Sequence, residues 1–589
     1  MKAYQEHLSE AATHNLGRWL TEPKYAEYRP EVEQMIEEER WKDLEDSFFK
    51  VIEFGTAGRR GTVGPGSNRI NRVTVGESTQ ALCDYAERFD PRAKVKGIAI
   101  ACDTRLSSPE LSRYAARVCA ANGFTTYIFD SFRSTPELSF AIRELGCVAG
   151  IVITASHNPS PDNGFKAYWD DGAQLVPPHD KGVLAMADAV ETIKAEPDFD
   201  NAVNQGKITI IDPSMDEKYF QAVLAQVVAD DRELVVAYSP LHGAGQTNTL
   251  PVLERAGFTV LVEKEQMVPD GHFPTVEGGK SNPEARVAND RVVALMLAEK
   301  ADIAITNDPD ADRFGVMIRQ GDRPIYLSCN QSAALGVDFM LRHMKEQDKL
   351  NGKQYIAKTI VTTDFIEEIA KRFNVKTVGN LLVGFKWIAE QIRLRPDEEY
   401  LLGVEESFGM CKGDYARDKD GASPSLLLAE AAAEQKKLGK TLYDRLLELY
   451  EEYGLFVERL DTMRCEGAEG FAEMQAIMAS VRGEAPASID GQEVTAVLDY
   501  KSGLRTDLQT GETSEIDCVK GDVFVLEFGD HRCRMTIRPS GTEPILKFYN
   551  QWYEASTDAP EADQTRVKRQ LENMSRELEG VLLGRIKQN

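Results

Sequence analysis

The chain has 589 residues, of which 42% are hydrophobic and 28% are charged. These are ordinary values for folded proteins, so they exclude a largely disordered chain. Acidic residues outnumber basic ones, 95 against 69, which gives a formal net charge of −26. A surface this acidic disfavours binding to nucleic acid or to an anionic membrane. At roughly 150 residues per domain, the length predicts about four domains.

Nine cysteines are spread along the chain, and no two of them form a C-x-x-C pair. An odd number of scattered cysteines disfavours a disulfide framework and a cysteine zinc site. The first twenty residues lack the basic-then-apolar pattern of a secretory signal, and no apolar run approaches transmembrane length. The sequence therefore predicts a cytoplasmic protein with no membrane partner and no nucleic-acid partner.

Residues 1–45 are polar and rich in Glu, Tyr and Trp, and we expect them to form a helical extension. Beyond them, apolar strands alternate with amphipathic helices. Strands are predicted at 95–103, 148–156, 233–240, 301–308, 353–363 and 399–407, and helices at 109–123 and 135–145. This alternation predicts α/β domains with largely parallel sheets.

The last part of the chain has a different pattern. Segments 523–530 and 532–540 are typical of paired strands, and residues 561–588 of a long charged helix, which together predict a smaller α+β domain. We place the domain boundaries near residues 215, 345 and 460. The predicted domains are then 1–215, 216–345, 346–460 and 461–589.

Polar loops with unusual chemistry follow apolar strands in each predicted domain. They lie at 154–159, 308–313, 403–409 and 538–544. In open α/β sheets, ligands bind beyond the carboxyl ends of the strands. One loop from each domain therefore predicts a single cleft shared by four domains.

The first loop places Ser156 beside His157. The serine could be a nucleophile, but taken alone these residues are more typical of a turn or a helix cap. The flanking residues do not match G-x-S-x-G, which disfavours a Ser-His-Asp hydrolase. Lys166 supplies a cation a few residues further on.

The second loop carries Asp308, Asp310 and Asp312 at alternating positions. Three such carboxylates can face the same way and bind a hard cation, for which Mg²⁺ is suited. An EF-hand is excluded because its sixth position here is Arg313 instead of Gly and its twelfth is Arg319 instead of Glu. A solvated acidic loop is the alternative, but aligned carboxylates repel one another without a counter-ion.

The third loop offers Glu405 and Ser407 as partners for sugar hydroxyls, although a polar strand end is the commoner explanation of such residues. Lys386, Arg417 and Lys419 lie in neighbouring loops. Each of these cations alone is more typical of a surface charge.

The fourth loop combines a guanidinium group, two hydroxyls and free backbone N–H groups. Its residues are Arg538, Ser540, Gly541 and Thr542. Such donors suit a phosphate monoester. An ordinary tight turn is the alternative, and the density of donors favours phosphate.

Together these loops resemble the active-site loops of the α-D-phosphohexomutase superfamily in order, spacing and content. TASHNP resembles its phosphoserine loop, DPDADR its metal loop, GVEESFG its sugar loop and RPSGTEP its phosphate loop. The segment 54–60, FGTAGRR, resembles its first active-site loop. The likeness runs from about residue 50 to 550. Ala57 and the run 163–181 make the chain similar to the long phosphoglucomutase and phosphopentomutase-type subgroup.

The resemblance implies a heart-shaped, four-domain α/β architecture, with three similar α/β domains and a smaller α+β C-terminal domain that can swing. It implies an isomerase that interconverts glucose 1-phosphate and glucose 6-phosphate through a phosphoserine and glucose 1,6-bisphosphate, with Mg²⁺ as cofactor. Phosphopentomutase, phosphomannomutase, glucose 1,6-bisphosphate synthase and a non-catalytic phosphosugar-binding protein stay open as alternatives. We expect a monomer or a weak homo-oligomer.

The resemblance also implies residue roles. Ser156 would be phosphorylated, and its phosphate would hold Mg²⁺ together with Asp308, Asp310 and Asp312. His157 and Lys419 would handle a proton or contact the substrate. The substrate-binding residues would be Arg60, Lys166, Arg313, Gly384, Lys386, Glu405, Ser407, Arg417, Arg538, Ser540, Gly541 and Thr542.

Overall fold

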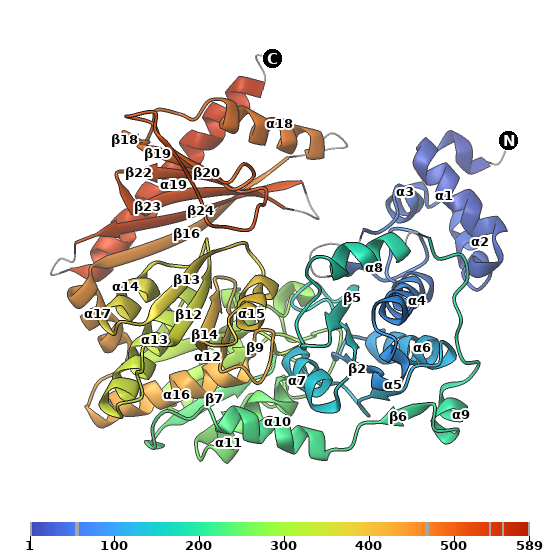
Figure 1. Cartoon of the computed structure of the whole chain (residues 1–589), viewed down its shortest axis with the longest axis horizontal. Helices are drawn as coiled ribbons and strands as arrows, with labels where there is room; N and C mark the ends of the chain where they lie inside the picture. The colour runs from blue at the N-terminus through green and yellow to red at the C-terminus, as the bar shows by residue number, and fades with distance from the viewer. Residues whose placement is uncertain are drawn as a thin grey trace. The chain divides into compact units, whose positions relative to one another are not determined.

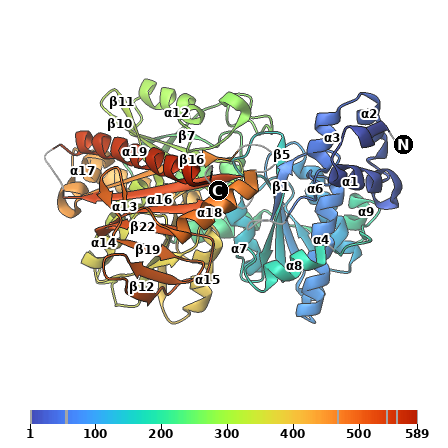
Figure 2. The same ribbon diagram turned by 90° about the horizontal axis from the view of Figure 1, so that it is seen from above.

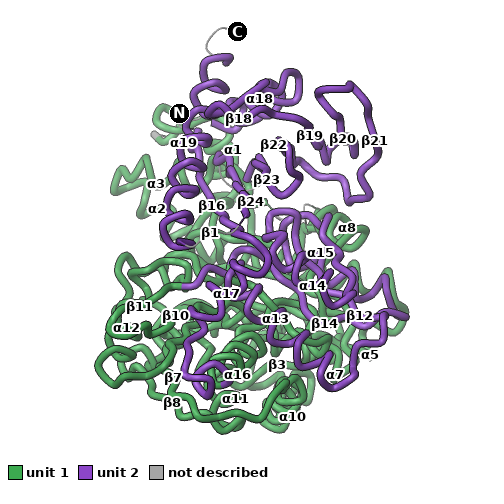
Figure 3. The backbone as a smooth tube through the Cα atoms, turned by 90° about the vertical axis from the view of Figure 1, so that its left-hand side faces the viewer, with its two compact units in different colours: residues 1–326, 408–433 green, residues 327–407, 434–589 purple. Residues whose placement is uncertain are grey.

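The computed structural model describes residues 3–53, 58–187, 189–465, 470–540, 544–555 and 559–586. The chain divides into two compact units (Figure 3). Unit 1 comprises residues 1–326 and 408–433, and unit 2 comprises residues 327–407 and 434–589. Each unit is therefore built from two separate stretches of sequence.

Unit 1 begins with three helices that pack on one another and on the next helix of the chain (Figure 2). They are α1 (Glu10–Thr21), α2 (Arg29–Glu37) and α3 (Trp41–Phe48). Their apolar side chains, among them Leu16, Trp19 and Phe48, are buried together with Val73 of α4 (Arg72–Phe89). The predicted helical extension is confirmed.

The first sheet of unit 1 has six strands in the order β1-β5-β4-β2-β3-β6. Four strands are parallel, whereas β5 and β1 run antiparallel to their neighbours. The strands are β1 (Arg59–Thr62), β2 (Ile98–Cys102), β3 (Thr126–Ile128), β4 (Ala149–Ile153), β5 (Asp162–Trp169) and β6 (Ile208–Ile210).

Helices cover both faces of this sheet, as the alternation of side chains along its strands requires. Ile98 and Ile100 pack in one cluster with α4 and α6, whereas Ala99 and Ala101 pack in another with α7. The helices around the sheet are α5 (Ala93–Lys96), α6 (Ser108–Ala121), α7 (Thr135–Leu145), α8 (His179–Ala187) and α9 (Phe199–Asn204).

The second sheet of unit 1 has the order β11-β10-β9-β7-β8, with β7, β8 and β9 parallel. Its strands are β7 (Val235–Ser239), β8 (Thr259–Val262), β9 (Ile303–Asn307), β10 (Phe314–Gln320) and β11 (Arg323–Tyr326). The helices of this region are α10 (Ser214–Leu224), α11 (Thr249–Arg255) and α12 (Arg286–Ala298). The later stretch of unit 1 contributes β15 (Gly409–Lys412) and most of α16 (Ala422–Lys437).

Unit 2 holds a parallel sheet in which β12 lies between β13 and β14. These strands are β12 (Gln354–Thr359), β13 (Lys376–Leu381) and β14 (Glu399–Glu405). The helices that accompany them are α13 (Cys329–Glu346), α14 (Phe365–Arg372), α15 (Phe385–Leu394) and α17 (Leu442–Tyr453).

The C-terminal part of unit 2 is an antiparallel sheet in the order β16-β24-β23-β22-β19-β20-β21, with helices α18 and α19 packed against it (Figure 1). The strands are β16 (Leu455–Arg464), β19 (Ala496–Asp499), β20 (Leu504–Asp507), β21 (Thr513–Glu515), β22 (Phe524–Phe528), β23 (Asp530–Pro539) and β24 (Ile545–Glu554). The helices are α18 (Gly470–Gly483) and α19 (Pro560–Ile586), and a separate hairpin pairs β17 (Ser488–Ile489) with β18 (Gln492–Glu493).

The predicted strands and helices correspond to β2, β4, β7, β9, β12, β14, α6 and α7, and the predicted C-terminal strand pair is the antiparallel pair β22 and β23. All nine cysteines are free, as expected. None of the helices that the structure describes combines the length and the apolar character needed to cross a bilayer. The domain boundaries near 215, 345 and 460 stay predictions.

Candidate active site

Ser156 lies directly beyond the carboxyl end of β4 and is 1% exposed. Its backbone has a φ of 50°, in the left-handed region that non-glycine residues rarely adopt. Its Oγ donates a hydrogen bond to Asp308 Oδ2 at 2.7 Å and lies 3.2 Å from His157 Nδ1. The serine hydroxyl is therefore fixed against the acidic loop that follows β9.

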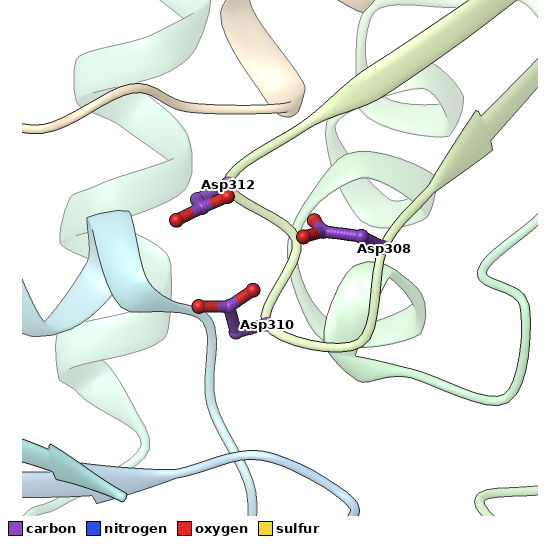
Figure 4. A group of neighbouring side chains, drawn as sticks. All are labelled: Asp308, Asp310 and Asp312. Carbon is purple, nitrogen blue, oxygen red and sulfur yellow. The ribbon is translucent and has the colours of Figure 1, made fainter. Parts of the chain in front are cut away.

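Asp308, Asp310 and Asp312 form the acidic group that the sequence predicts, and all three are 0% exposed. Each offers a carboxylate oxygen, and these oxygens lie within 4.8 Å of one another. Figure 4 shows the three carboxylates converging from one loop. Residues 309–312 form a turn, in which the Ala311 amide donates to Asp308 O at 2.9 Å and Ala311 has a φ of 52°, and this turn brings the three carboxylates together.

Two lysines neutralise part of this acidic group. Lys166 Nζ, from β5, lies 2.8 Å from Asp310 Oδ2 and 3.4 Å from Asp312 Oδ2. Lys419 Nζ lies 3.0 Å from the same Asp312 oxygen. Burial would raise the pKa of Asp310, but Lys166 and Lys419 hold it below its ordinary value. The site therefore concentrates opposite charges where water is excluded.

Two buried carboxylate oxygens of the group, Asp310 Oδ1 and Asp312 Oδ1, receive no hydrogen bond from the described residues. Buried polar atoms are normally satisfied, so such oxygens indicate a missing partner. Burial, followed by the charges of Asp310 and Asp312, raises the pKa of Asp308 well above its ordinary value. Three clustered carboxylates, two of which have an oxygen without a hydrogen-bond donor among the described residues, are a suitable ligand set for a hard divalent cation.

The other predicted residues of unit 1 lie around this centre. Arg313 Nε is 3.9 Å from Asp308 Oδ2 and 3.8 Å from Asp312 Oδ1, and Arg60 Nη1 donates to Asn158 Oδ1 at 3.2 Å. Burial, together with Arg313 and Arg60, lowers the pKa of His157 well below its ordinary value. Arg417 pairs instead with Asp414, at 3.6 Å.

The predicted residues of unit 2 form a second group at strand ends. Glu405 ends β14, and Ser407 Oγ donates to Glu406 Oε1 at 3.2 Å. Burial, and then the neighbouring Glu405, raises the pKa of Glu406 to about 7, against which Arg538 of β23 acts. The sugar-loop carboxyls and the first cation of the phosphate loop are thus electrostatic neighbours.

Three predicted residues of unit 2 have other surroundings. Gly384 precedes α15 with a φ of 122°, a conformation suited to glycine, and Lys386 Nζ lies 5.0 Å from the centre of the Trp387 ring. The Ser540 amide donates to Ile545 O at 2.8 Å. Gly541 and Thr542 lie outside the described residues, as does the segment 54–57 that contains Ala57.

Sequence reasoning missed several residues that hold the centre in place. Thr135, at the start of α7, donates its hydroxyl to Asp310 Oδ2 at 2.8 Å and its amide to Asp310 O at 2.9 Å. Asp418 lies 3.3 Å from Lys419 Nζ and accepts a hydrogen bond from Tyr168 at 2.8 Å. Nothing in the sequence marked these residues. Two other missed residues, Asp103 and Arg105, do follow the end of β2, and that position at a strand end is a signal that could have found them.

Comparison with known proteins identifies the family. Models of the alpha/beta/alpha domains I, II and III of phosphoglucomutase/phosphomannomutase match residues 51–194, 217–321 and 331–453. A phosphoglucomutase of Staphylococcus saprophyticus is 35% identical over 530 residues, 88% of this chain and 93% of its own. A Staphylococcus aureus phosphoglucomutase is 32% identical over 539 residues, covering 90% and 94%.

Solved structures share the fold. A putative phosphomannomutase of Thermus thermophilus has a TM-score of 0.63 at 20% identity, covering 90% of this chain and 99% of its own. The Paramecium phosphoglucomutase parafusin has a TM-score of 0.62 at 17% identity, covering 90% and 98%. The chain belongs to the phosphoglucomutase/phosphomannomutase family. The predicted family, its architecture of three α/β domains with a β-rich C-terminal domain, and the enzyme class, a phosphosugar mutase, are confirmed.

Proposed function

We propose that this protein interconverts glucose 1-phosphate and glucose 6-phosphate, with Ser156 as the phosphoryl carrier and glucose 1,6-bisphosphate as the intermediate. The observation that carries the proposal is the hydrogen bond from Ser156 Oγ to Asp308 Oδ2, 2.7 Å long, at a buried group of three carboxylates. A serine hydroxyl that donates to a carboxylate of a buried acidic group supports a role in phosphoryl transfer, and its flanking residues lack the G-x-S-x-G pattern of an acyl-transfer serine. The phosphoglucomutases that are 32–35% identical support glucose as the sugar.

Asp308, Asp310 and Asp312 would hold Mg²⁺ together with the phosphate of Ser156. The fit rests on the oxygen donors and on the two buried carboxylate oxygens, Asp310 Oδ1 and Asp312 Oδ1, that lack hydrogen-bond donors among the described residues. When bound, Mg²⁺ would neutralise charge on the transferring phosphoryl oxygens.

The chain's own residues align the reaction. Asp308 Oδ2 accepts the proton of the Ser156 hydroxyl in a hydrogen bond and so fixes the direction of Oγ. Lys166 and Lys419 bring positive charge to the same buried place, where electrostatic interactions are strong because water is excluded. Neutral His157, whose Nδ1 lies 3.2 Å from the serine oxygen, would donate its ring N–H to Oγ, because the serine's own proton is directed to Asp308.

In unit 2, Glu405 and Ser407 would bind sugar hydroxyls, and Arg538, with the loop that follows it, would bind the phosphate that is not transferred. Carboxylates and hydroxyls accept and share the hydrogen bonds of a sugar, and a guanidinium group binds phosphate through two parallel N–H donors. Lys386 and Gly384 would complete the sugar loop. Four domains with boundaries near 215, 345 and 460, a cytoplasmic location and a monomer or weak homo-oligomer complete the proposal.

The test is intact-mass measurement with peptide mapping, before and after incubation with glucose 1,6-bisphosphate and Mg²⁺. We expect one phosphate on Ser156, which glucose 6-phosphate then removes. Ser156→Ala should carry no phosphate and lose mutase activity by at least about 10⁴-fold, because the covalent carrier is gone. Ser160→Ala, in the same loop, is the matched control and should keep both.

The alternatives predict different results. Faster turnover of ribose or mannose phosphates, compared by kcat/KM, would assign a phosphopentomutase or a phosphomannomutase. Net production of the bisphosphate from a phosphoryl donor would assign a synthase. A Ser156 that stays unphosphorylated, with phosphosugar binding intact and no turnover, would assign a binding protein.

A further inference from the structure

Arg105 is a buried arginine that holds the loop carrying Ser156. It follows β2 by three residues and is 1% exposed. Its Nη1 donates to Pro159 O and Asp162 O, both at 2.8 Å. Its Nη2 donates to Ser156 O and Asn158 O, both at 2.6 Å. One guanidinium group thus binds four carbonyl oxygens of a single loop.

The same guanidinium group is tied to the Ser156 amide by a second route. Its Nε lies 3.2 Å from Asp103 Oδ2, which accepts the Thr154 hydroxyl at 2.6 Å. Thr154 Oγ1 in turn accepts the Ser156 N–H at 2.7 Å. Arg105 therefore binds the Ser156 C=O directly, whereas the Ser156 N–H is linked through Thr154 to Asp103, which forms an ion pair with Arg105.

This double hold has a conformational purpose. Ser156 has a φ of 50°, and a non-glycine residue stays in that region only when its surroundings over-determine it. The carbonyl held by Arg105 and the amide held by Thr154 fix the two peptide groups that flank the Ser156 Cα. The direction of Oγ toward Asp308 depends on those two peptide groups.

A segment of unit 1 that follows β8 closes the other side. The Phe273 ring centre lies 5.2 Å from the Arg105 guanidinium carbon, and the Ser160 amide donates to Gly279 O at 3.0 Å. A Cβ at Gly271 would lie 2.4 Å from Leu106 N, so glycine is needed for this close approach. This segment therefore covers the Arg105 guanidinium group, which is 1% exposed.

We propose that Arg105 is a positioning residue for phosphoryl transfer, which sets the orientation of the Ser156 hydroxyl by binding the four carbonyls of its loop. The inference rests on the proposed mutase function. Arg105 would affect the step in which Ser156 Oγ meets the phosphoryl group and would not affect binding of the sugar. A lysine cannot replace the arginine, because an ammonium group has three donors and no planar fork.

The test compares Arg105→Lys with the wild type in steady-state mutase assays. We expect kcat to fall by about 10²-fold or more, because a small misplacement of a reacting atom is costly, with KM changed less than threefold. Phosphorylation of Ser156 by glucose 1,6-bisphosphate should slow in parallel. Hydrogen exchange of the amides in residues 155–162, measured by mass spectrometry, should accelerate.

Arg232→Lys is the matched control. Arg232 also binds three backbone carbonyls of unit 1, those of Ala256, Ala229 and Asp231, at 2.7–2.8 Å. It should lose a similar amount of thermal stability and keep kcat within threefold. A kcat for Arg105→Lys within threefold of wild type, or an equal loss of kcat in both variants, would overturn the proposal.

A second variant and a second readout cover the cases in which the first comparison fails. If Arg105→Lys does not fold, Asp103→Asn loosens the guanidinium without removing it, and we expect kcat to fall about tenfold with KM unchanged; wild-type kcat would overturn the proposal. If the wild-type protein interconverts no sugar phosphate, the mutase function fails. The exchange of residues 155–162 then still decides whether Arg105 holds the loop.

Discussion

The acidic centre of unit 1 is fully buried and paired with two buried lysines, whereas the end of β14 in unit 2 carries two adjacent carboxyls, one of them half-buried. In unit 1, Lys166 and Lys419 lie within 3.0 Å of the acidic group. In unit 2, Glu406 has a pKa raised to about 7 and only partial burial. Under the proposed function, unit 1 aligns the phosphoryl transfer and unit 2 binds the sugar and the phosphate that is not transferred.

Among the tests that compare the two units, the largest expected effect is that of a change in the acidic group. Asp310→Asn should lower kcat by about 10³-fold, because it removes a charge from the cation site. Titration calorimetry with Mg²⁺ should show weaker binding, and a chelator should inactivate the wild type reversibly. Asp322→Asn, on an exposed turn, is the control. Equal Mg²⁺ affinity in both variants would contradict the assignment of the metal site.

The next effect tests the paired lysine. Lys166→Met should lower kcat by about 10²-fold, since its ammonium lies 2.8 Å from Asp310 and would stabilise charge in the transition state. KM should change little. Lys181→Met is the control: this lysine is exposed on α8, outside the acidic group, and the variant should behave as wild type. If the lysine variant changed KM alone, unit 1 would bind substrate instead of aligning the reaction.

Unit 2 should respond in the opposite sense. Arg538→Met should raise KM by about 10–100-fold and change kcat less, because it removes a charge-assisted hydrogen bond to the phosphate. Steady-state kinetics with glucose 1-phosphate measures both constants. Arg532→Met, on the same strand but paired with Asp530, is the control. A loss confined to kcat would erase the contrast between the two units.

The smallest effect is a pH dependence of stability. Because the folded-state pKa of Glu406 is raised from 4.5 to about 7, the folded protein keeps a proton that the unfolded chain has released, so the stability of the protein falls as pH rises from 4.5 to about 7 and levels off above that. Glu406→Gln should therefore gain about 1–2 kcal/mol relative to wild type between pH 5 and pH 8. Urea unfolding at the two pH values measures it; a pH-independent difference would contradict the shift.

The local parts of the site could be predicted from the sequence. A buried strand followed by closely spaced carboxylates indicated that Asp308, Asp310 and Asp312 lie together beyond the strand end, although the turn at Ala311 that makes them converge was not predicted. Short strands with no buried residue, such as β20 and β21, were not predicted, because they carry little apolar pattern.

Long-range partners could not be predicted. Lys419 and Asp312 are more than a hundred residues apart, and Thr135 meets Asp310 only because α7 and the acidic loop belong to one unit. Arg105 follows a strand end, as the predicted site residues do, yet its guanidinium binds backbone carbonyls, which no side-chain pattern in a sequence can indicate.

The interrupted sequence of unit 1 has a consequence for synthesis in the cell. Residues 408–433, which supply Lys419, leave the ribosome about a hundred residues after the acidic loop. At 5–20 residues per second, the acidic loop waits roughly 5–20 s for its second cation. During that interval, Lys166 and Arg313 are the cations among the described residues that balance the nascent acidic loop, so a divalent cation present during synthesis would stabilise the loop before Lys419 arrives.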